Sequence, residues 1–351
     1  MLASAVRLLQ RARDVYVVVR FRMGNGSMDY TTLGRTGMRV SVAGLGCGGF
    51  SRLGLGTGGA ETGAIAIIHQ AIEHGVNLFD TAAAYGTEAV LGKAIKTVPR
   101  DKVVICTKAP FSWSTGRATP EGIVASLDNS LRQLDTDYVD VYQLHGVPPS
   151  NYAHALEQLA PVLLRERDKG KFRFLGITET GPHDLQHDTL NRAAQDGVWD
   201  VVMVGFSMAH QNARQFVFPL TLKHRVGTLL MFAVRNIFSQ PGRLQATLRE
   251  LAAAGEVPAA LAESDDPLGF LIHPGGASSV VDAAYRYVRH EPGVDVVLFG
   301  TGSLAHLQTN IASLLKPPLP EADRARLGEV FGHLVGVGLD APHLSNPRPR
   351  S

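Results

Sequence analysis

Short apolar runs and longer amphipathic stretches alternate along most of the chain. The apolar runs have the length of buried strands, and the amphipathic stretches have the period of helices. The predicted strands are 42–46, 76–80, 103–108, 139–145, 172–178, 201–206, 228–233 and 294–300. The predicted helices are 62–74, 88–96, 119–134, 154–169, 184–195, 211–222, 276–290 and 304–315. Eight βα units in one α/β chain favour a (β/α)8 TIM barrel over an open doubly wound sheet.

Two segments fall outside this repeat. Residues 30–41 alternate between apolar and polar positions and turn at GRTG, which predicts an N-terminal hairpin that could plug the barrel. Residues 237–279 form a long insertion after the seventh strand and contain the helical stretch LQATLRELAAAG. Because long loops on the active face often shape a pocket, we expect this insertion to cover substrate or cofactor.

The composition narrows the classes of function. The 351 residues are 45% hydrophobic and carry a formal charge of +2, so a basic footprint for nucleic acid is absent. No apolar run reaches the roughly 18–20 residues of a membrane helix. Two cysteines exclude a disulfide framework and fit a reducing compartment, which predicts a cytoplasmic protein. No heptad pattern is present, so we expect a monomer that acts on a small molecule.

The pattern predicts one domain with two flanking segments. Residues 28–340 form the single barrel domain. Residues 1–27 are rich in arginine with a single acidic residue, and fit a disordered extension, a transit peptide, or translated sequence upstream of a start at Met28. Residues 341–351 are Pro-rich and polar and predict a flexible tail.

Four polar side chains stand at or just after the ends of three successive predicted strands. They are Asp80 and Tyr85 in VNLFDTAAAYG, Lys108 in VVICTK and His145 in VDVYQLH. Taken singly, each has an ordinary structural explanation as a helix cap, a surface lysine, a packing aromatic or a core histidine. Their shared placement at the face where parallel barrels carry their chemistry favours a catalytic site instead.

Together these four residues predict acid–base chemistry. A carboxylate buried at a barrel mouth requires a cation, and Lys108 is the expected partner of Asp80. An adjacent ammonium favours phenolate, so we expect Lys108 to lower the pKa of Tyr85 from its ordinary value of about 10. Tyr85 would then serve as a general acid or base, and His145 would bind a substrate oxygen. No paired metal-ligand spacing competes with this reading.

With these motifs the chain resembles the aldo-keto reductase superfamily over about residues 28–335. The resemblance rests on TTLGRTGMRVSVAGLGCGG, NLFDTAAAYG, DKVVICTK, DYVDVYQLH, GKFRFLGIT and FGTGSLAHLQTNI. It implies a barrel that binds an extended nicotinamide dinucleotide across its C-terminal mouth without a metal. Asp80, Tyr85, Lys108 and His145 match the catalytic tetrad of the family.

The resemblance also assigns a cofactor site, with departures from the common pattern. Thr178 and Glu179 stand where many members have a Ser-Asn pair for the nicotinamide amide, Met203 stands where many have Gln, and Phe232 replaces the stacking Tyr. The expected cofactor-binding residues are Cys47, Gly48, Asp80, Thr178, Phe232, Gly300, Thr301, Gly302, Ser303, His306 and Asn310. The small residues from Gly300 to Ser303 suit backbone donation to phosphate.

The adenosine end of this site predicts NAD rather than NADP. Residues 300–310 contain no Arg or Lys to pair with a 2′-phosphate, and His306 stands at the usual basic position. An NAD enzyme usually runs as a dehydrogenase, and the changed amide pocket resembles the L-galactose or aldose 1-dehydrogenase branch. We therefore expect oxidation of an aldose, with Phe50, Trp113 and Arg235 as substrate contacts.

Three other functions stay open at this stage. The protein could be an NADPH-dependent aldehyde or ketone reductase. It could instead be a cofactor-binding regulatory subunit of a membrane channel with little turnover. A lyase or hydrolase that uses Lys108 as a Schiff-base nucleophile is disfavoured, because that chemistry needs an amine without a tight carboxylate partner.

Overall fold

The computed structural model describes residues 28–111 and 118–339. The predicted extension 1–27, the predicted tail 341–351 and Trp113 lie outside the described residues. Of the helices within those ranges, none is long and apolar enough to span a bilayer.

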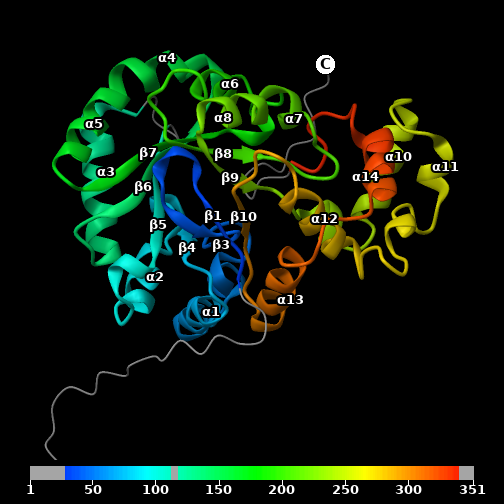
Figure 1. Cartoon of the computed structure of the whole chain (residues 1–351), viewed down its shortest axis with the longest axis horizontal. Coiled ribbons are helices and arrows are strands. Elements are labelled where there is room, and N and C mark those ends of the chain that lie inside the picture. The colour runs from blue at the N-terminus through cyan, green and yellow to red at the C-terminus, as the bar shows by residue number, and fades with distance from the viewer. Residues whose placement is uncertain (1–27, 112–117, 340–351) are drawn as a thin grey trace, which may run out of the picture.

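The eight predicted strands form a closed, parallel barrel (Figure 1). Its strands are β3 (Ala43–Gly46), β4 (Leu78–Asp80), β5 (Val104–Pro110), β6 (Val139–Val147), β7 (Phe172–Glu179), β8 (Val201–Gly205), β9 (Gly227–Met231) and β10 (Val296–Phe299). They follow chain order around the barrel, with β10 beside β3. The predicted (β/α)8 fold is confirmed, because buried runs of this kind satisfy their backbone groups only when strands lie on both sides.

Fourteen helices accompany the barrel in the described residues, and most of those that follow a strand lie where the amphipathic stretches predicted them. They are α1 (Glu61–Glu73), α2 (Glu88–Ile95), α3 (Pro120–Leu134), α4 (Tyr152–His154), α5 (Ala160–Asp168), α6 (Asp188–Ala193), α7 (Ala213–Phe216), α8 (Phe218–His224), α9 (Asn236–Ser239), α10 (Arg243–Ala253), α11 (Ala259–Glu263), α12 (Val280–Arg289), α13 (Leu304–Leu314) and α14 (Glu321–Phe331). A π-helical turn at Ala155–Leu159 joins α4 to α5.

Two of the predicted helices differ from the observed ones for local reasons. The predicted helix 211–222 is split into α7 and α8, because Pro219 in the first turn of α8 has no N–H to continue the ladder. The predicted helix 184–195 begins only at Asp188, because His187 adopts a left-handed conformation with φ of 58°. The pattern missed α14 altogether.

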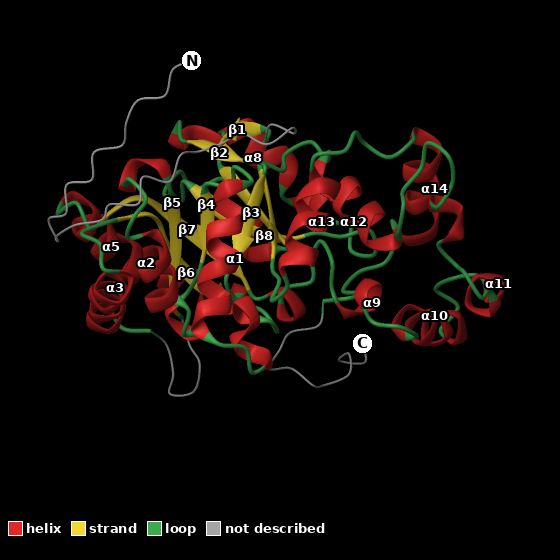
Figure 2. Cartoon of the chain, turned by 90° about the horizontal axis from the view of Figure 1, so that it is seen from below, coloured by secondary structure: helices red, strands yellow, loops and turns green. Residues whose placement is uncertain are grey.

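The hairpin β1 (Tyr30–Thr32) and β2 (Arg39–Ser41) closes the N-terminal end of the barrel (Figure 2). Leu33 is fully buried and joins the apolar cluster inside the barrel with Val104 and Val141. The next residue, Gly34, has no room for a side chain, since a Cβ would lie 2.2 Å from the backbone nitrogen of Gly227. The predicted plug is therefore present and leaves only the C-terminal end of the barrel open.

The insertion after β9 contributes to the cavity only at its start. Asn236, Phe238 and Ser239 line the large cavity at the C-terminal end of the barrel. Figures 1 and 2 show α10 and α11 beyond the ring of helices, on the same side of the molecule as α14. The expectation that the whole insertion covers the site is therefore wrong for α10 and α11.

Candidate active site

Lys108 and Asp80 form a buried ion pair at the C-terminal ends of neighbouring strands. The Lys108 Nζ donates to both carboxylate oxygens of Asp80 at 2.7 Å and to the carbonyl oxygen of Thr81 at 2.8 Å. The side chain of Lys108 is 0% exposed. Three donated bonds use every N–H of an ammonium, so the charge stays on Lys108 despite its burial.

Tyr85 and His145 lie directly above this pair. The Tyr85 hydroxyl is 3.3 Å from Nε2 of His145, and the two rings meet edge to face. The Lys108 Nζ is 5.1 Å from the centroid of the Tyr85 ring. The structure thus brings together all four residues that the sequence predicted for catalysis.

Burial controls the protonation of both polar groups that face the cavity. Burial and, to a lesser extent, the charge of Lys108 lower the pKa of His145 to about 3, so the imidazole is neutral. Burial also raises the pKa of the Tyr85 phenol, with Lys108 opposing and Asp80 reinforcing that rise. The expectation that Lys108 lowers this pKa overall is therefore wrong: the nearby ammonium limits the rise without reversing it.

The pKa of Lys108 itself is raised above its ordinary value. Burial alone would lower this pKa, but the Asp80 carboxylate and the Tyr85 phenol favour the ammonium and outweigh it. The group can therefore orient and polarise Tyr85 without giving up its own proton.

Gly48 supports the face of the Tyr85 ring. A Cβ at this position would lie 2.5 Å from Cε2 and 2.7 Å from Cζ of the phenol ring. Real Cβ atoms do not come this close, so any larger residue displaces the tyrosine. The sequence had assigned Gly48 to cofactor contact, and its clearest role in the structure is to make room for Tyr85.

A cavity of about 960 Å³ opens above these residues. It holds most of the predicted cofactor and substrate residues, together with others that the sequence did not indicate. The predicted residues that line it are Gly48, Phe50, Asp80, Tyr85, His145, Thr178, Phe232, Arg235, Gly300, Thr301, His306 and Asn310. Asp80, Tyr85 and His145 therefore share one continuous space with the predicted adenosine contacts.

Three predicted cofactor residues do not line this cavity. Cys47 is fully buried in the core outside the barrel, and burial raises the pKa of its thiol. Gly302 packs on the neighbouring loop, where a Cβ would lie 2.7 Å from the Cα of Gly54. Ser303 caps α13, and its backbone N–H donates to the Thr301 hydroxyl, so that amide is not available to a phosphate.

Phe232 presents its ring to the cavity from the loop after β9. Its φ of 73° is unusual for a residue with a side chain, and the ring edge packs against Gly181 and Gly205. The guanidinium of Arg235 lies 4.5 Å from the Phe232 centroid and 5.4 Å from that of Phe50. These contacts hold an aromatic surface in the cavity that Tyr85 and His145 also line.

Sequence reasoning missed a cation and an ion pair at this cavity. Arg52 lines it from the loop after β3, two residues beyond the predicted contact Phe50. Glu179, at the end of β7, bonds Nδ1 of His187 at 2.7 Å. The position of Arg52 in the loop after a predicted strand could have indicated it as a site residue. The pairing of Glu179 with His187 could not be predicted in this way, because it depends on a left-handed turn that the sequence pattern does not show.

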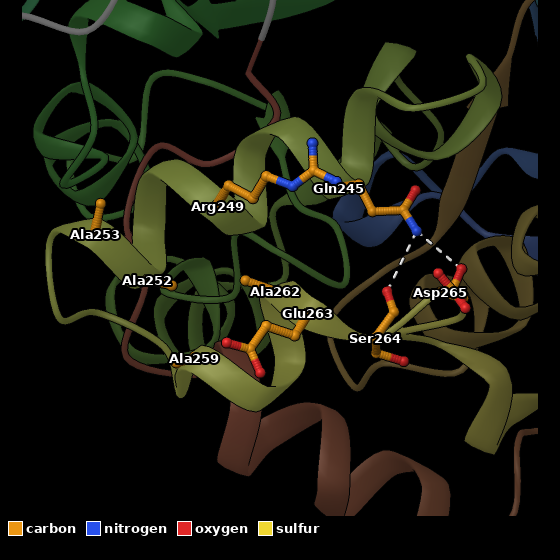
Figure 3. Close-up of a pocket in the computed structure, with 9 residues that line it drawn as sticks. All are labelled: Gln245, Arg249, Ala252, Ala253, Ala259, Ala262, Glu263, Ser264 and Asp265. Atoms are coloured by element: carbon orange, nitrogen blue, oxygen red, sulfur yellow. Dashed lines mark hydrogen bonds between the residues drawn. The ribbon is translucent and has the colours of Figure 1, made fainter.

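A second hollow of about 560 Å³ lies between α10 and α11 (Figure 3). Alanines form much of its wall, with Arg249 and Glu263 nearby and Gln245 bonded to the carbonyl oxygens of Ser264 and Asp265. It contains no residue of the tetrad, so the chemistry belongs to the larger cavity. No cluster of metal-ligating side chains occurs in residues 28–111 and 118–339.

Comparison with known proteins agrees with this geometry. Residues 45–331 match the model of the aldo/keto reductase family. The chain belongs to the aldo/keto reductase family. The aldo-keto reductase YhdN of Bacillus subtilis (strain 168) is 28% identical over 297 residues, which cover 80% of this chain and 87% of that protein. The L-galactose dehydrogenase of Arabidopsis thaliana is 27% identical over 323 residues, covering 88% and 95% respectively.

Solved structures of the family share the fold. The aldo-keto reductase AKR11C1 of Bacillus halodurans, in its holo form, superposes with a TM-score of 0.65 at 21% identity, covering 89% of this chain and all of that one. An aldo-keto reductase of Klebsiella pneumoniae, solved in complex with NADPH, has a TM-score of 0.62 at 22% identity, covering 92% and 99%. Within this family the protein is an NAD(P)-dependent oxidoreductase that acts on carbonyl or alcohol groups.

The contact between Gly48 and Tyr85 generates a direct prediction. Gly48→Ala should reduce kcat by at least about 100-fold, because a misplaced acid–base group loses most of its contribution. Steady-state kinetics together with a thermal melt would measure this effect. Gly63→Ala, at a helical site with open space, is the matched control and should leave kcat unchanged. Full activity in Gly48→Ala would contradict the conclusion that the missing side chain at residue 48 makes room for Tyr85.

Proposed function

We propose that this protein oxidises an aldose with NAD as the hydride acceptor and Tyr85 as the acid–base residue. The choice of NAD over NADP rests on the residues at the end of the cavity where the adenosine would bind. His306, Thr309 and Asn310 line it, and residues 300–310 contain neither Arg nor Lys. A dianionic 2′-phosphate would meet no cation on this segment, whereas a ribose hydroxyl needs only a polar partner.

The residues present fit a nicotinamide dinucleotide. Phe232 offers a flat surface in the cavity that Tyr85 and His145 line, and Asn310 and Thr301 lie in the same cavity. The hydroxyl of Thr180 is buried with no hydrogen-bond partner among the described residues, so it can serve a polar ligand. When bound, the cofactor supplies the site that accepts or donates a hydride.

Each member of the tetrad has a separate task in this proposal. Neutral His145 hydrogen-bonds the reacting oxygen and fixes its position beside Tyr85. Tyr85 takes the hydroxyl proton of an alcohol during oxidation, or returns it to a carbonyl oxygen during reduction. Lys108, held by Asp80, favours the charge that develops on the phenol oxygen.

The mouth of the cavity supports a polyhydroxylated substrate. Neutral polar side chains from three loops line it, among them Ser51, Asn236 and Ser239, alongside the aromatic ring of Phe50. Hydroxyl and amide groups can bond sugar hydroxyls, and an aromatic ring packs against the apolar face of a sugar. The relationship to L-galactose dehydrogenase supports the same substrate class.

One observation favours a second function, NADPH-dependent carbonyl reduction. Arg52 approaches the cavity from the loop after β3, and Gly54 of that loop contacts Gly302. A cation on this side could bind a 2′-phosphate that residues 300–310 cannot.

The proposal is tested by absorbance at 340 nm with purified protein. NAD or NADP is tried with a panel of aldoses, and NADH or NADPH with aldehydes and ketones. We expect turnover of an aldose with NAD that falls by at least about 1,000-fold in Tyr85→Phe, which keeps the ring but removes the acid–base group. Carbonyl reduction that depends on NADPH, with no aldose oxidation, would contradict the proposal.

A cation placed at residue 306 should change the cofactor preference. His306→Arg should strengthen NADP binding relative to NAD binding by about tenfold, because a guanidinium pairs with the 2′-phosphate. Dissociation constants from isothermal titration would measure the ratio. His306→Gln, a neutral control, should leave the ratio near that of the wild type. An unchanged ratio in His306→Arg would show that this residue does not face the adenosine ribose.

A further inference from the structure

Glu179 and His187 form a second buried ion pair, on the wall of the cavity. Both side chains are only 1% exposed, and Oε2 of Glu179 lies 2.7 Å from Nδ1 of His187. The other oxygen, Oε1, accepts the backbone N–H of Gly205 at 2.6 Å. The tetrad does not use this pair.

The hydrogen bonds around His187 indicate that it is an imidazolium. Asn212 donates its Nδ2 to the carbonyl oxygen of Leu185 at 2.6 Å, so its Oδ1 is left to accept from Nε2 of His187 at 3.0 Å. Nδ1 of His187 faces the carboxylate of Glu179. With Glu179 ionised, both ring nitrogens donate, which requires the charged form. Burial raises the pKa of Glu179, and the charge of His187 and the N–H of Gly205 oppose that rise. Burial opposes that charge, but Glu179 outweighs it and raises the pKa of His187.

The negative end of this pair lies toward the cavity. Glu179 lines the cavity, whereas His187 is fully buried and does not line it. The neighbouring His210 ring, 5.1 Å from His187, is neutral, since burial and His187 lower its pKa to about 3. A ligand in the cavity thus meets the carboxylate first and the balancing cation behind it.

This carboxylate sits beside the ring of Phe232, at the end of β7, and β7 pairs with β6, the strand that carries His145. The point where a Cβ of Gly205 would stand is 3.3 Å from Oε1 of Glu179 and 3.0 Å from Cδ2 of Phe232. A nicotinamide that exchanges a hydride with a carbon held at Tyr85 and His145 must lie in this part of the cavity. Its ring is a cation when oxidised and neutral when reduced.

We propose that Glu179, held by His187, strengthens the binding of the oxidised nicotinamide more than the binding of the reduced nicotinamide. The inference rests on the proposed dinucleotide function and adds to it a selectivity for the oxidised cofactor. Glu179 favours occupation of the site by the hydride acceptor, while it makes the bound ring a weaker acceptor. A carboxylate several ångströms from the ring stabilises only the cationic form, and the more distant imidazolium offsets part of that effect. Glu179 is a positioning and tuning residue here and takes no part in proton transfer.

Glu179→Gln tests the proposal while keeping the local hydrogen bonds. The amide oxygen can accept from Gly205, and the amide NH2 can donate to Nδ1 of a neutral His187. Isothermal titration would give dissociation constants for NAD+ and NADH in both proteins. We expect the ratio of the NAD+ constant to the NADH constant to rise by roughly tenfold in the variant.

Glu88→Gln is the matched control, because Glu88 is equally buried, bonds Thr107 and does not line the cavity. Its ratio should equal that of the wild type. An unchanged ratio in Glu179→Gln, or an equal weakening of both forms, would overturn the proposal. If Glu179→Gln folds poorly, the double variant Glu179→Gln/His187→Gln, which removes both charges, serves for the same comparison.

The ratio of the two dissociation constants can be measured whether or not the protein uses NAD or oxidises an aldose. Should the wild type prefer NADP, the same ratio is measured with NADP+ and NADPH, because the charge on the nicotinamide ring does not depend on the 2′-phosphate. Failure of the NAD or aldose proposal therefore leaves this measurement valid.

Discussion

The buried ion pair between Lys108 and Asp80 is the constraint on which the site depends. Two charges removed from water destabilise a fold unless each is fully hydrogen-bonded. Here the ammonium donates to both carboxylate oxygens and to the Thr81 carbonyl, and the strands that carry these groups are adjacent. A closed barrel with a plugged N-terminal end excludes water from beneath the pair, so the field of Lys108 acts on Tyr85 through a medium that screens little.

Burial then decides the protonation states above the pair. His145 is neutral and Tyr85 keeps its proton, so in the described structure the site is set to donate a hydrogen bond and a proton to a carbonyl oxygen. Oxidation needs the opposite state of the phenol. On the cofactor side, the carboxylate of Glu179 favours occupation of the site by the oxidised cofactor that oxidation requires, and at the same time makes the bound ring a weaker hydride acceptor.

The sequence predicted the strands and the tetrad because both depend on local signals. Buried strands appear as apolar runs, and the four polar residues stand at their ends, where parallel topology brings them together. The residues of the proposed cofactor site were harder to predict. Gly48, a predicted cofactor contact, does line the cavity, but the sequence did not indicate that its lack of a side chain also makes room for Tyr85. Ser303 and Gly302 were read as phosphate contacts, but capping and loop packing engage them. His187 was missed because its role requires a left-handed turn and a partner on another element.

The pH dependence of carbonyl reduction tests most directly whether burial sets these protonation states. The account predicts that kcat/KM stays flat from about pH 5 to pH 9, because the pKa of His145 lies below this range and the raised pKa of Tyr85 lies above it. The rate should fall only beyond the ordinary tyrosine pKa of about 10, as the phenol loses the proton that it donates. A titration between pH 5 and 8, or a fall that is complete by pH 9, would contradict the account.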